Sequence, residues 1–166
     1  MDVLYQRVLD ALGELSGRRI VDAYAGIGVL SVELAERVGD SGAVICIEES
    51  DVSARLGLLN ARLNGFEQRI SYDRRSVEEA LPDAASQGAA AVVLDPPRAG
   101  CAGSVTGWLA LAGPPLVVYV SCDPATLARD LHVLVASGPY VIAALDVVDM
   151  FPQTHHVECV ATLRRS

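Results

Sequence analysis

The sequence predicts an α/β fold in which a mostly parallel sheet of seven strands carries helices on both faces and ends in an antiparallel hairpin. Short β-type runs alternate with segments of helical periodicity along the chain, which is typical of a parallel sheet covered by helices. The last two β-type runs follow each other without an intervening helix, which predicts the hairpin. The chain has 166 residues, 51% of them hydrophobic, enough for one packed core. We therefore expect a single domain over 1–166.

Each element follows from the local pattern of the sequence. Strands are expected over 19–24, 43–48, 69–72, 90–95, 116–121, 140–148 and 157–164. Helices are expected over 29–38, 51–64, 76–81, 102–112 and 124–137. Asp123 before Pro124 marks the start of the last helix, because a capping carboxylate followed by proline at the first helical position favours initiation.

Charge and cysteine usage argue against several classes of protein. The net charge of −8 and the pI of about 4.7 argue against a chain that grips nucleic acid by itself, because Lys and Arg supply most nonspecific affinity. The four cysteines show neither a CxxC pair nor the spacing of zinc or iron–sulfur sites. No secretory signal is recognisable, and no apolar run approaches the roughly 20 residues of a membrane span. We expect a cytoplasmic protein with free thiols.

The segment 21–29, Val-Asp-Ala-Tyr-Ala-Gly-Ile-Gly-Val, runs from a strand into two glycines that open a helix. Gly26 and Gly28 permit a tight turn and a close approach of backbone to ligand. Glu48 ends the next strand about 20 residues later, where an acidic side chain typically accepts hydrogen bonds from ribose hydroxyls. The pattern predicts a site for a nucleoside cofactor, although the missing third glycine disfavours NAD. The alternatives are simple turn chemistry and, for Glu48, an ordinary strand-end charge.

The segment 95–100, Asp-Pro-Pro-Arg-Ala-Gly, follows the fourth expected strand. Its prolines stiffen the backbone at the sheet edge where ligands of open α/β sheets bind. Asp-Pro-Pro followed by Tyr or Phe resembles the motif of amino-methyltransferases, in which the aromatic ring stacks on the target base. Here Arg98 replaces that ring, and a plain loop is the alternative interpretation.

The segment 120–130, Val-Ser-Cys-Asp-Pro-Ala-Thr-Leu-Ala-Arg-Asp, places Cys122 between a strand and a helix N-terminus. The partial positive charge of that terminus favours a reactive thiolate. A small buried residue is the alternative, and it is the interpretation for Cys46 and Cys159, whereas Cys101 stays indeterminate.

The segment 149–159, Asp-Met-Phe-Pro-Gln-Thr-His-His-Val-Glu-Cys, concentrates aromatic, polar and titratable groups between the last two strands. Glu158 is directed into the sheet edge or is a solvated strand residue. His155 and His156 lack a third ligand at metal-site spacing, so we expect no metal.

Together the four segments resemble the catalytic domain of the RNA uracil-C5-methyltransferase family, which uses S-adenosylmethionine to form 5-methyluridine in tRNA or ribosomal RNA. The motifs of that family are Asp-x-Tyr-x-Gly-x-Gly, Asp-Pro-Pro-Arg-x-Gly, Ser-Cys-x-Pro-x-Thr-Leu-x-Arg-Asp and Asp-Met-Phe-Pro-x-Thr-x-His-x-Glu. All four occur here in family order between Asp22 and Glu158. The resemblance implies the class I methyltransferase form of the Rossmann-like fold, whose sheet ends in the hairpin expected above.

The resemblance also implies roles for individual residues. Cys122 is expected to be the nucleophile that adds to uracil C6, and Glu158 the base that removes the C5 proton. Contacts to S-adenosylmethionine are expected from Tyr24, Gly26, Gly28, Glu48, Ser76 and Asp95. Contacts to the RNA are expected from among Arg98, Arg129, His155 and His156.

The sequence departs from the family at several points. Ala25 stands where the family often has cysteine, Val29 where it often has a polar residue, and Ser76 where it often has Asn. Full-length members also carry an upstream RNA-binding region, in some with an iron–sulfur cluster, and a glutamine-containing segment that touches the cofactor. We expect this chain to lack these parts and to need another domain or a partner chain to hold RNA. Two alternatives stay open: an amino-methyltransferase acting on a base, and a noncatalytic or incomplete cofactor-binding domain.

Overall fold

The computed structural model of the protein describes residues 2–136, 138–149 and 157–166. Its strands form one seven-stranded sheet in the order β3-β2-β1-β4-β5-β7-β6. The strands β1 to β5 run parallel, whereas β7 is antiparallel to both of its neighbours. The predicted fold class, including the hairpin, is confirmed. The strand bounds are β1 (Arg19–Ala23), β2 (Ala43–Ile47), β3 (Ile70–Asp73), β4 (Ala91–Leu94), β5 (Leu116–Ser121), β6 (Tyr140–Val148) and β7 (Glu158–Arg165).

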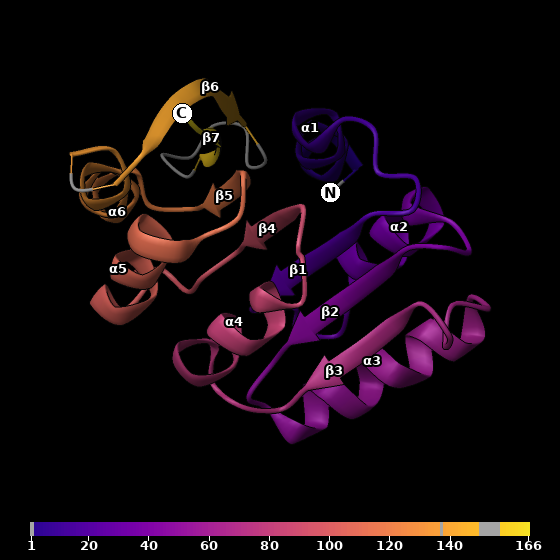
Figure 1. The fold of residues 1–166 in the computed structure, drawn as a ribbon. Coiled ribbons are helices and arrows are strands. Elements are labelled where there is room, and N and C mark those ends of the chain that lie inside the picture. Colours follow the sequence, from indigo (N-terminus) through magenta and orange to yellow (C-terminus); the bar gives the residue numbers. More distant parts are fainter. Residues whose placement is uncertain (1, 137, 150–156) are drawn as a thin grey trace.

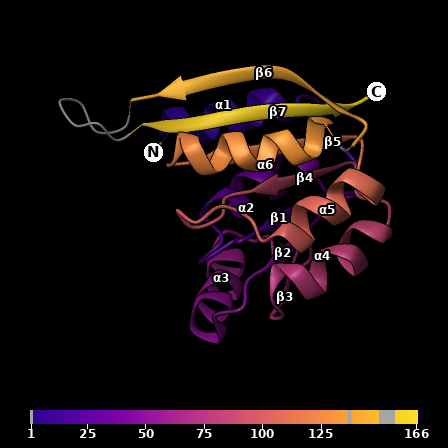
Figure 2. The same cartoon turned by 90° about the vertical axis from the view of Figure 1, so that its left-hand side faces the viewer.

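Helices cover both faces of the sheet (Figure 1). The first three helices pack on one face and the last three on the other. Figure 2 shows α6 lying along the β6–β7 hairpin. None of the helices in the described ranges is long and apolar enough to cross a membrane. The helix bounds are α1 (Asp2–Leu12), α2 (Val29–Val38), α3 (Asp51–Leu63), α4 (Val77–Ser86), α5 (Gly103–Ala112) and α6 (Pro124–Ala136).

Alternation along the central strands divides the apolar core into two layers, because successive side chains of a strand point to opposite faces. In β5, Val118 and Val120 face the layer under α1 and α2, whereas Val117 and Tyr119 face the layer under α4 to α6. The same alternation decides on which side the residues at the strand ends emerge.

Two helices differ from the sequence prediction. The helix α1 was not predicted, although Leu4, Val8 and Leu12 are spaced four residues apart and are all buried. The helix α4 continues to Ser86, beyond its expected end at residue 81. Pro82 lies inside it and removes one backbone donor. The helix continues because its following turn still contributes the buried Ala84 to the core.

Candidate active site

The glycine turn after β1 joins two strand ends through backbone contacts. Gly26 and Gly28 both have positive φ, 55° and 76°, a conformation that glycine adopts without penalty. A Cβ on Gly28 would lie 2.4 Å from the Tyr72 hydroxyl, whereas a Cβ on Gly26 would meet nothing within 4 Å. Gly28 is therefore required by packing, and Gly26 faces open space that a ligand can use.

Glu48 is attached to this turn. Its Oε2 accepts a hydrogen bond from the Gly26 amide at 2.9 Å, and its Oε1 accepts one from the Ser50 amide at 2.8 Å. The neighbouring Glu49 is exposed. The carboxylate of Glu48 thus stands half-buried at the end of β2, at the predicted place for an acceptor of ribose hydroxyls.

A pocket of about 560 Å³ opens at this edge of the sheet, within the size range of small-molecule sites. Two of the predicted cofactor residues, Tyr24 and Glu48, line it, while Ser76 precedes the lining residues Val77 and Glu78. Sequence analysis missed Val77 and Glu78, although a helix start directly after a strand end would have indicated them. The remaining lining residues are Ile47, Glu49, Pro97, Ala99, Gly100, Cys101 and Ala102.

Tyr24 adopts a strained backbone conformation in this pocket. Its φ of 65° is the only positive value among the non-glycine residues that the structure describes, and a bulky side chain rarely adopts this region. Burial raises the pKa of its hydroxyl, and the neighbouring Cys101 adds to the effect. The phenol therefore stays protonated and can donate a hydrogen bond at neutral pH.

Beneath the turn lies a buried polar chain that sequence analysis did not single out. The Ser31 hydroxyl donates to Asp22 Oδ2 at 2.5 Å, and the Cys46 thiol donates to Ser31 Oγ at 3.1 Å. Asp22 is only 2% exposed. Burial raises its pKa to about 7, the charge of Asp95 adds to this, and the bond from Ser31 opposes it. A single carboxylate within an apolar strand run was the available signal.

The strand register brings Cys122 and Glu158 together. Ser121 and Cys159 form the last pair of the antiparallel β5–β7 ladder. Cys122 and Glu158 are the next residues along the two segments, so both lie at the end of this ladder. Both side chains are partly buried, and Cys122 directly precedes the capped first turn of α6. The prediction that these two residues meet at one sheet edge agrees with this register; their catalytic roles stay predictions.

Asp95 completes a group of titratable side chains at this edge. Although its side chain is exposed, surrounding protein desolvates the carboxylate and raises its pKa to about 6, with the charge of Glu158 adding to the shift. Desolvation likewise raises the pKa of Glu158, and the Arg98 guanidinium opposes it. Tyr5, from α1, also faces this group. Burial is the main cause that raises the pKa of its hydroxyl, and the charges of Asp95 and Asp22 add to the effect. These residues lie beside the pocket along the sheet edge and do not line it.

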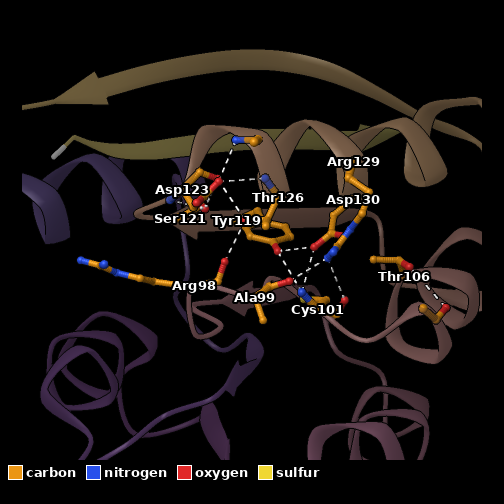
Figure 3. A network of polar contacts seen from close by, with 12 residues as sticks. Arg98, Ala99, Cys101, Thr106, Tyr119, Ser121, Asp123, Thr126, Arg129 and Asp130 are labelled. Carbon is orange, nitrogen blue, oxygen red and sulfur yellow. Dashed lines mark hydrogen bonds and ion pairs between the residues drawn. The ribbon is translucent and has the colours of Figure 1, made fainter. Parts of the chain in front are cut away.

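The two arginines expected to contact RNA differ in their surroundings (Figure 3). Arg98 is exposed and its side chain extends away from the polar network drawn there. The Arg129 guanidinium instead pairs with Asp130 and donates to the carbonyls of Ala99 and Cys101 at 2.9 and 3.2 Å. Arg129 is thus engaged within the protein, and its contact with RNA stays a prediction.

The other expected contacts, His155 and His156, lie outside the described residues. Within the described ranges, no three His, Cys, Asp or Glu side chains gather as metal ligands would. Cys46, Cys101 and Cys159 are buried, whereas Cys122 is partly accessible.

Comparisons with known proteins agree with the geometry. The family model described as tRNA (Uracil-5-)-methyltransferase matches residues 4–166. An uncharacterised RNA methyltransferase of Gloeobacter violaceus is 48% identical over 98% of this chain and 33% of its own length. A 23S rRNA (uracil(1939)-C(5))-methyltransferase of Aromatoleum aromaticum is 39% identical over 99% of this chain and 38% of its own length. The chain thus spans about a third of the length of these curated relatives.

Solved structures of other proteins are also similar to this chain. The tRNA (uracil-54, C5)-methyltransferase of Pyrococcus abyssi, in complex with S-adenosyl-L-homocysteine, is 31% identical with a TM-score of 0.81, over 97% of this chain and 37% of that one. TrmN from Thermus thermophilus, at 19% identity and a TM-score of 0.75 over 99% of this chain and 48% of its own, shares the fold. On the family match over almost its whole length, the chain belongs to the tRNA (uracil-5-)-methyltransferase family.

Proposed function

We propose that this domain transfers a methyl group from S-adenosylmethionine to C5 of a uridine in tRNA or ribosomal RNA, through a covalent bond between Cys122 and C6. The observation that carries the proposal is the register of β5 and β7, whose last pair, Ser121 and Cys159, adjoins Cys122 and Glu158 at the edge that also holds the pocket. The relatives named for uracil-C5 methylation and the S-adenosyl-L-homocysteine complex of one of them support it.

The pocket fits a nucleoside cofactor. Glu48 supplies a preoriented carboxylate for ribose hydroxyls, Gly26 leaves room for close approach, and Tyr24 supplies a protonated hydroxyl. Glu49 and the exposed Glu78 also line the pocket and suit a ligand that carries a positive charge. S-adenosylmethionine, when bound, supplies an electrophilic methyl group on a sulfonium.

The two residues at the ladder end perform the remaining chemistry. The Cys122 thiolate forms a bond to C6, which moves the C5–C6 electron pair toward C5 and O4 and makes C5 nucleophilic toward the methyl group. After C5 has gained the methyl group, with S-adenosylhomocysteine as the leaving group, Glu158 takes the proton that C5 still carries. The electron pair left behind re-forms the C5–C6 double bond, and the thiolate leaves C6. The raised pKa of Glu158 suits a base, because a carboxylate with a higher pKa holds the proton more strongly.

The RNA is held by more than this domain. A base within folded RNA must turn out of its stack to reach the sheet edge. The charge of the exposed Arg98 near Glu158 supports its proposed contact with that nucleotide. The net charge of −8 leaves little capacity to neutralise phosphates. We infer that further protein, either elsewhere in the full-length protein or in a partner chain, supplies most of the affinity for RNA, and that the protein acts in the cytoplasm.

The test uses RNA that carries tritium at uracil C5. The domain is joined to the upstream region of the Gloeobacter violaceus relative, and RNA binding is measured in parallel. We expect one tritium released to water for each methyl group transferred. Cys122→Ala should abolish both, whereas the buried Cys46→Ala should retain both. Methyl transfer without tritium release, mapped to an exocyclic nitrogen, would identify an amino-methyltransferase instead, and cofactor binding without any methyl transfer to bound RNA would indicate a noncatalytic domain.

A further inference from the structure

One wall of the pocket is a loop without regular secondary structure. After β4 ends at Leu94, residues 97 and 99–102 line the pocket before α5 begins at Gly103. A turn closed by the Gly100 amide and the Pro97 carbonyl, at 2.8 Å, is the backbone bond within this loop. A wall of this kind needs support from outside the loop to hold one conformation.

That support comes from residues of β5 and α6 (Figure 3). Asp130 Oδ2 accepts the Cys101 amide at 2.8 Å and the Tyr119 hydroxyl at 2.6 Å. Its other oxygen accepts Arg129 Nε at 2.8 Å, and the same guanidinium donates to two loop carbonyls. The Thr126 hydroxyl lies 3.1 Å from the carbonyl of Arg98.

The loop lies so close to α6 that only glycine fits at position 100. Gly100 has a φ of 75°, and a Cβ there would lie 2.6 Å from both Arg129 and the Asp130 carboxylate. Asp130 and Tyr119 are 3% and 0% exposed, so this carboxylate is satisfied only by protein groups. Burial of a carboxylate is costly unless it is fully hydrogen-bonded. Exchange of Asp130 for an apolar residue would therefore release the loop.

The same group also reaches Tyr24, another residue that lines the pocket. The Cys101 thiol interacts with the hydroxyls of both Tyr119 and Tyr24, while burial raises its pKa to about 11. Cys101 therefore stays a thiol that joins the strained Tyr24 to the Tyr119–Asp130 pair. No part of this arrangement belongs to the proposed chemistry of Cys122 and Glu158.

We propose that Asp130 is a positioning residue for the cofactor: with Tyr119 and Arg129 it holds the loop 97–102 in the conformation that the bound cofactor requires. A preformed wall binds more tightly, because the ligand does not have to order it. The inference rests on the proposed cofactor site. It also gives Arg129 and Asp130 a function in the domain that does not depend on RNA.

The test compares two tyrosines with the same chemistry. Tyr119→Phe removes the hydroxyl that donates to Asp130, and Tyr140→Phe removes an equally buried hydroxyl that donates to the Pro114 carbonyl, far from the pocket. Calorimetric titration with S-adenosylhomocysteine should show affinity lowered about three- to tenfold in Tyr119→Phe and within about twofold of wild type in Tyr140→Phe. Asp130→Asn, measured under conditions in which the variant is folded, should bind S-adenosylhomocysteine about tenfold or more weakly than wild type.

Two further readouts separate positioning from general stability. Exchange of the Cys101 amide hydrogen should be faster in Tyr119→Phe and unchanged in Tyr140→Phe, at matched thermal stability. In the fusion protein with the upstream region, Tyr119→Phe should raise KM for S-adenosylmethionine by a factor similar to the loss in affinity, with kcat within about twofold. Equal cofactor affinity in wild type and Tyr119→Phe would overturn this inference and leave the proposed function standing. Failure of the wild type to bind S-adenosylhomocysteine would overturn the cofactor site itself.

Discussion

At the scale of single residues, Glu48 is the residue that we propose to accept hydrogen bonds from the ribose of the cofactor. Its carboxylate already accepts the Gly26 amide, and a Gln in its place would set an NH₂ group against ribose hydroxyls or against that amide. Because hydrogen bonds to charged acceptors contribute about 1.5–3 kcal/mol, Glu48→Gln should weaken binding of S-adenosylhomocysteine by at least about tenfold. The exposed Glu36→Gln on α2 is the chemically matched control and should bind as the wild type does. Equal binding by both variants in calorimetry would exclude Glu48 from the site.

The buried Asp22 makes the stability of the fold depend on pH. Its pKa is raised to about 7, so its protonated form is favoured by folding. The stabilisation that protonated Asp22 contributes is fully present below the pKa of the unfolded state, near 4, and is lost as pH rises through 7. The corresponding decrease in the free energy of unfolding is on the order of 2–4 kcal/mol. Urea unfolding of the wild type and of Asp22→Asn, each at pH 5 and 8, should show a smaller fall in unfolding free energy for the variant. A parallel pH dependence in both proteins would contradict the assignment.

At the scale of elements, the two glycines of the turn serve different purposes: Gly28 is needed for packing, and Gly26 leaves space beside the turn. Gly28→Ala adds positive-φ strain and a clash with Tyr72, which together should cost about 2–4 kcal/mol of unfolding free energy. Gly26→Ala adds the strain alone, about 1–2 kcal/mol, but its methyl group enters the space proposed for the cofactor. We expect Gly28→Ala to be the less stable variant in denaturant titration. Gly26→Ala should show the larger loss of cofactor affinity relative to its loss of stability. The reverse order in stability would show that the turn is packed differently.

The helices and strands were predictable to different degrees. The hairpin β6–β7 followed from two β-type runs without a helix between them, and the start of α6 followed from Asp123, whose carboxylate accepts the amides of Ala125 and Thr126. The helix α1 is indicated only by three apolar residues at a spacing of four. The end of α4 is not visible locally, because Pro82 normally breaks a helix, whereas packing of the following turn, with Ala84 buried, maintains this one.

At the scale of the whole molecule, sequence motifs located the segments at the sheet edge but not the contacts that support them. Cys122 and Glu158 both follow from this topology as residues at the end of the β5–β7 ladder, while their joint role stays a prediction. The buried chain from Asp22 to Cys46 and the bonds between Asp130 and the loop 97–102 join residues distant in sequence. Such contacts depend on the packing of whole layers, and the pattern of residues along one element does not reveal them.

The distribution of charge leads to a prediction about RNA. All 13 basic residues are arginines, against 21 acidic residues, and several of these arginines pair with aspartates, among them Arg55, Arg69, Arg74, Arg75 and Arg129. The domain alone should therefore bind RNA weakly and lose that binding steeply with salt. Electrophoretic mobility shifts at about 50 and 200 mM salt check this. Tight binding that resists salt would show that the domain needs no further RNA-binding region.

The central claim is the covalent bond between Cys122 and uracil C6, and RNA containing 5-fluorouridine tests it most directly. Fluorine at C5 cannot leave as a cation, so Glu158 finds no proton to remove and the adduct persists. With RNA binding secured by the fusion to the upstream region, a protein–RNA band that survives denaturing electrophoresis should form with wild type and Cys46→Ala. It should be absent with Cys122→Ala. Formation of the same band by Cys122→Ala, or its absence from wild-type protein that binds the RNA and methylates unmodified uridine, would contradict the mechanism.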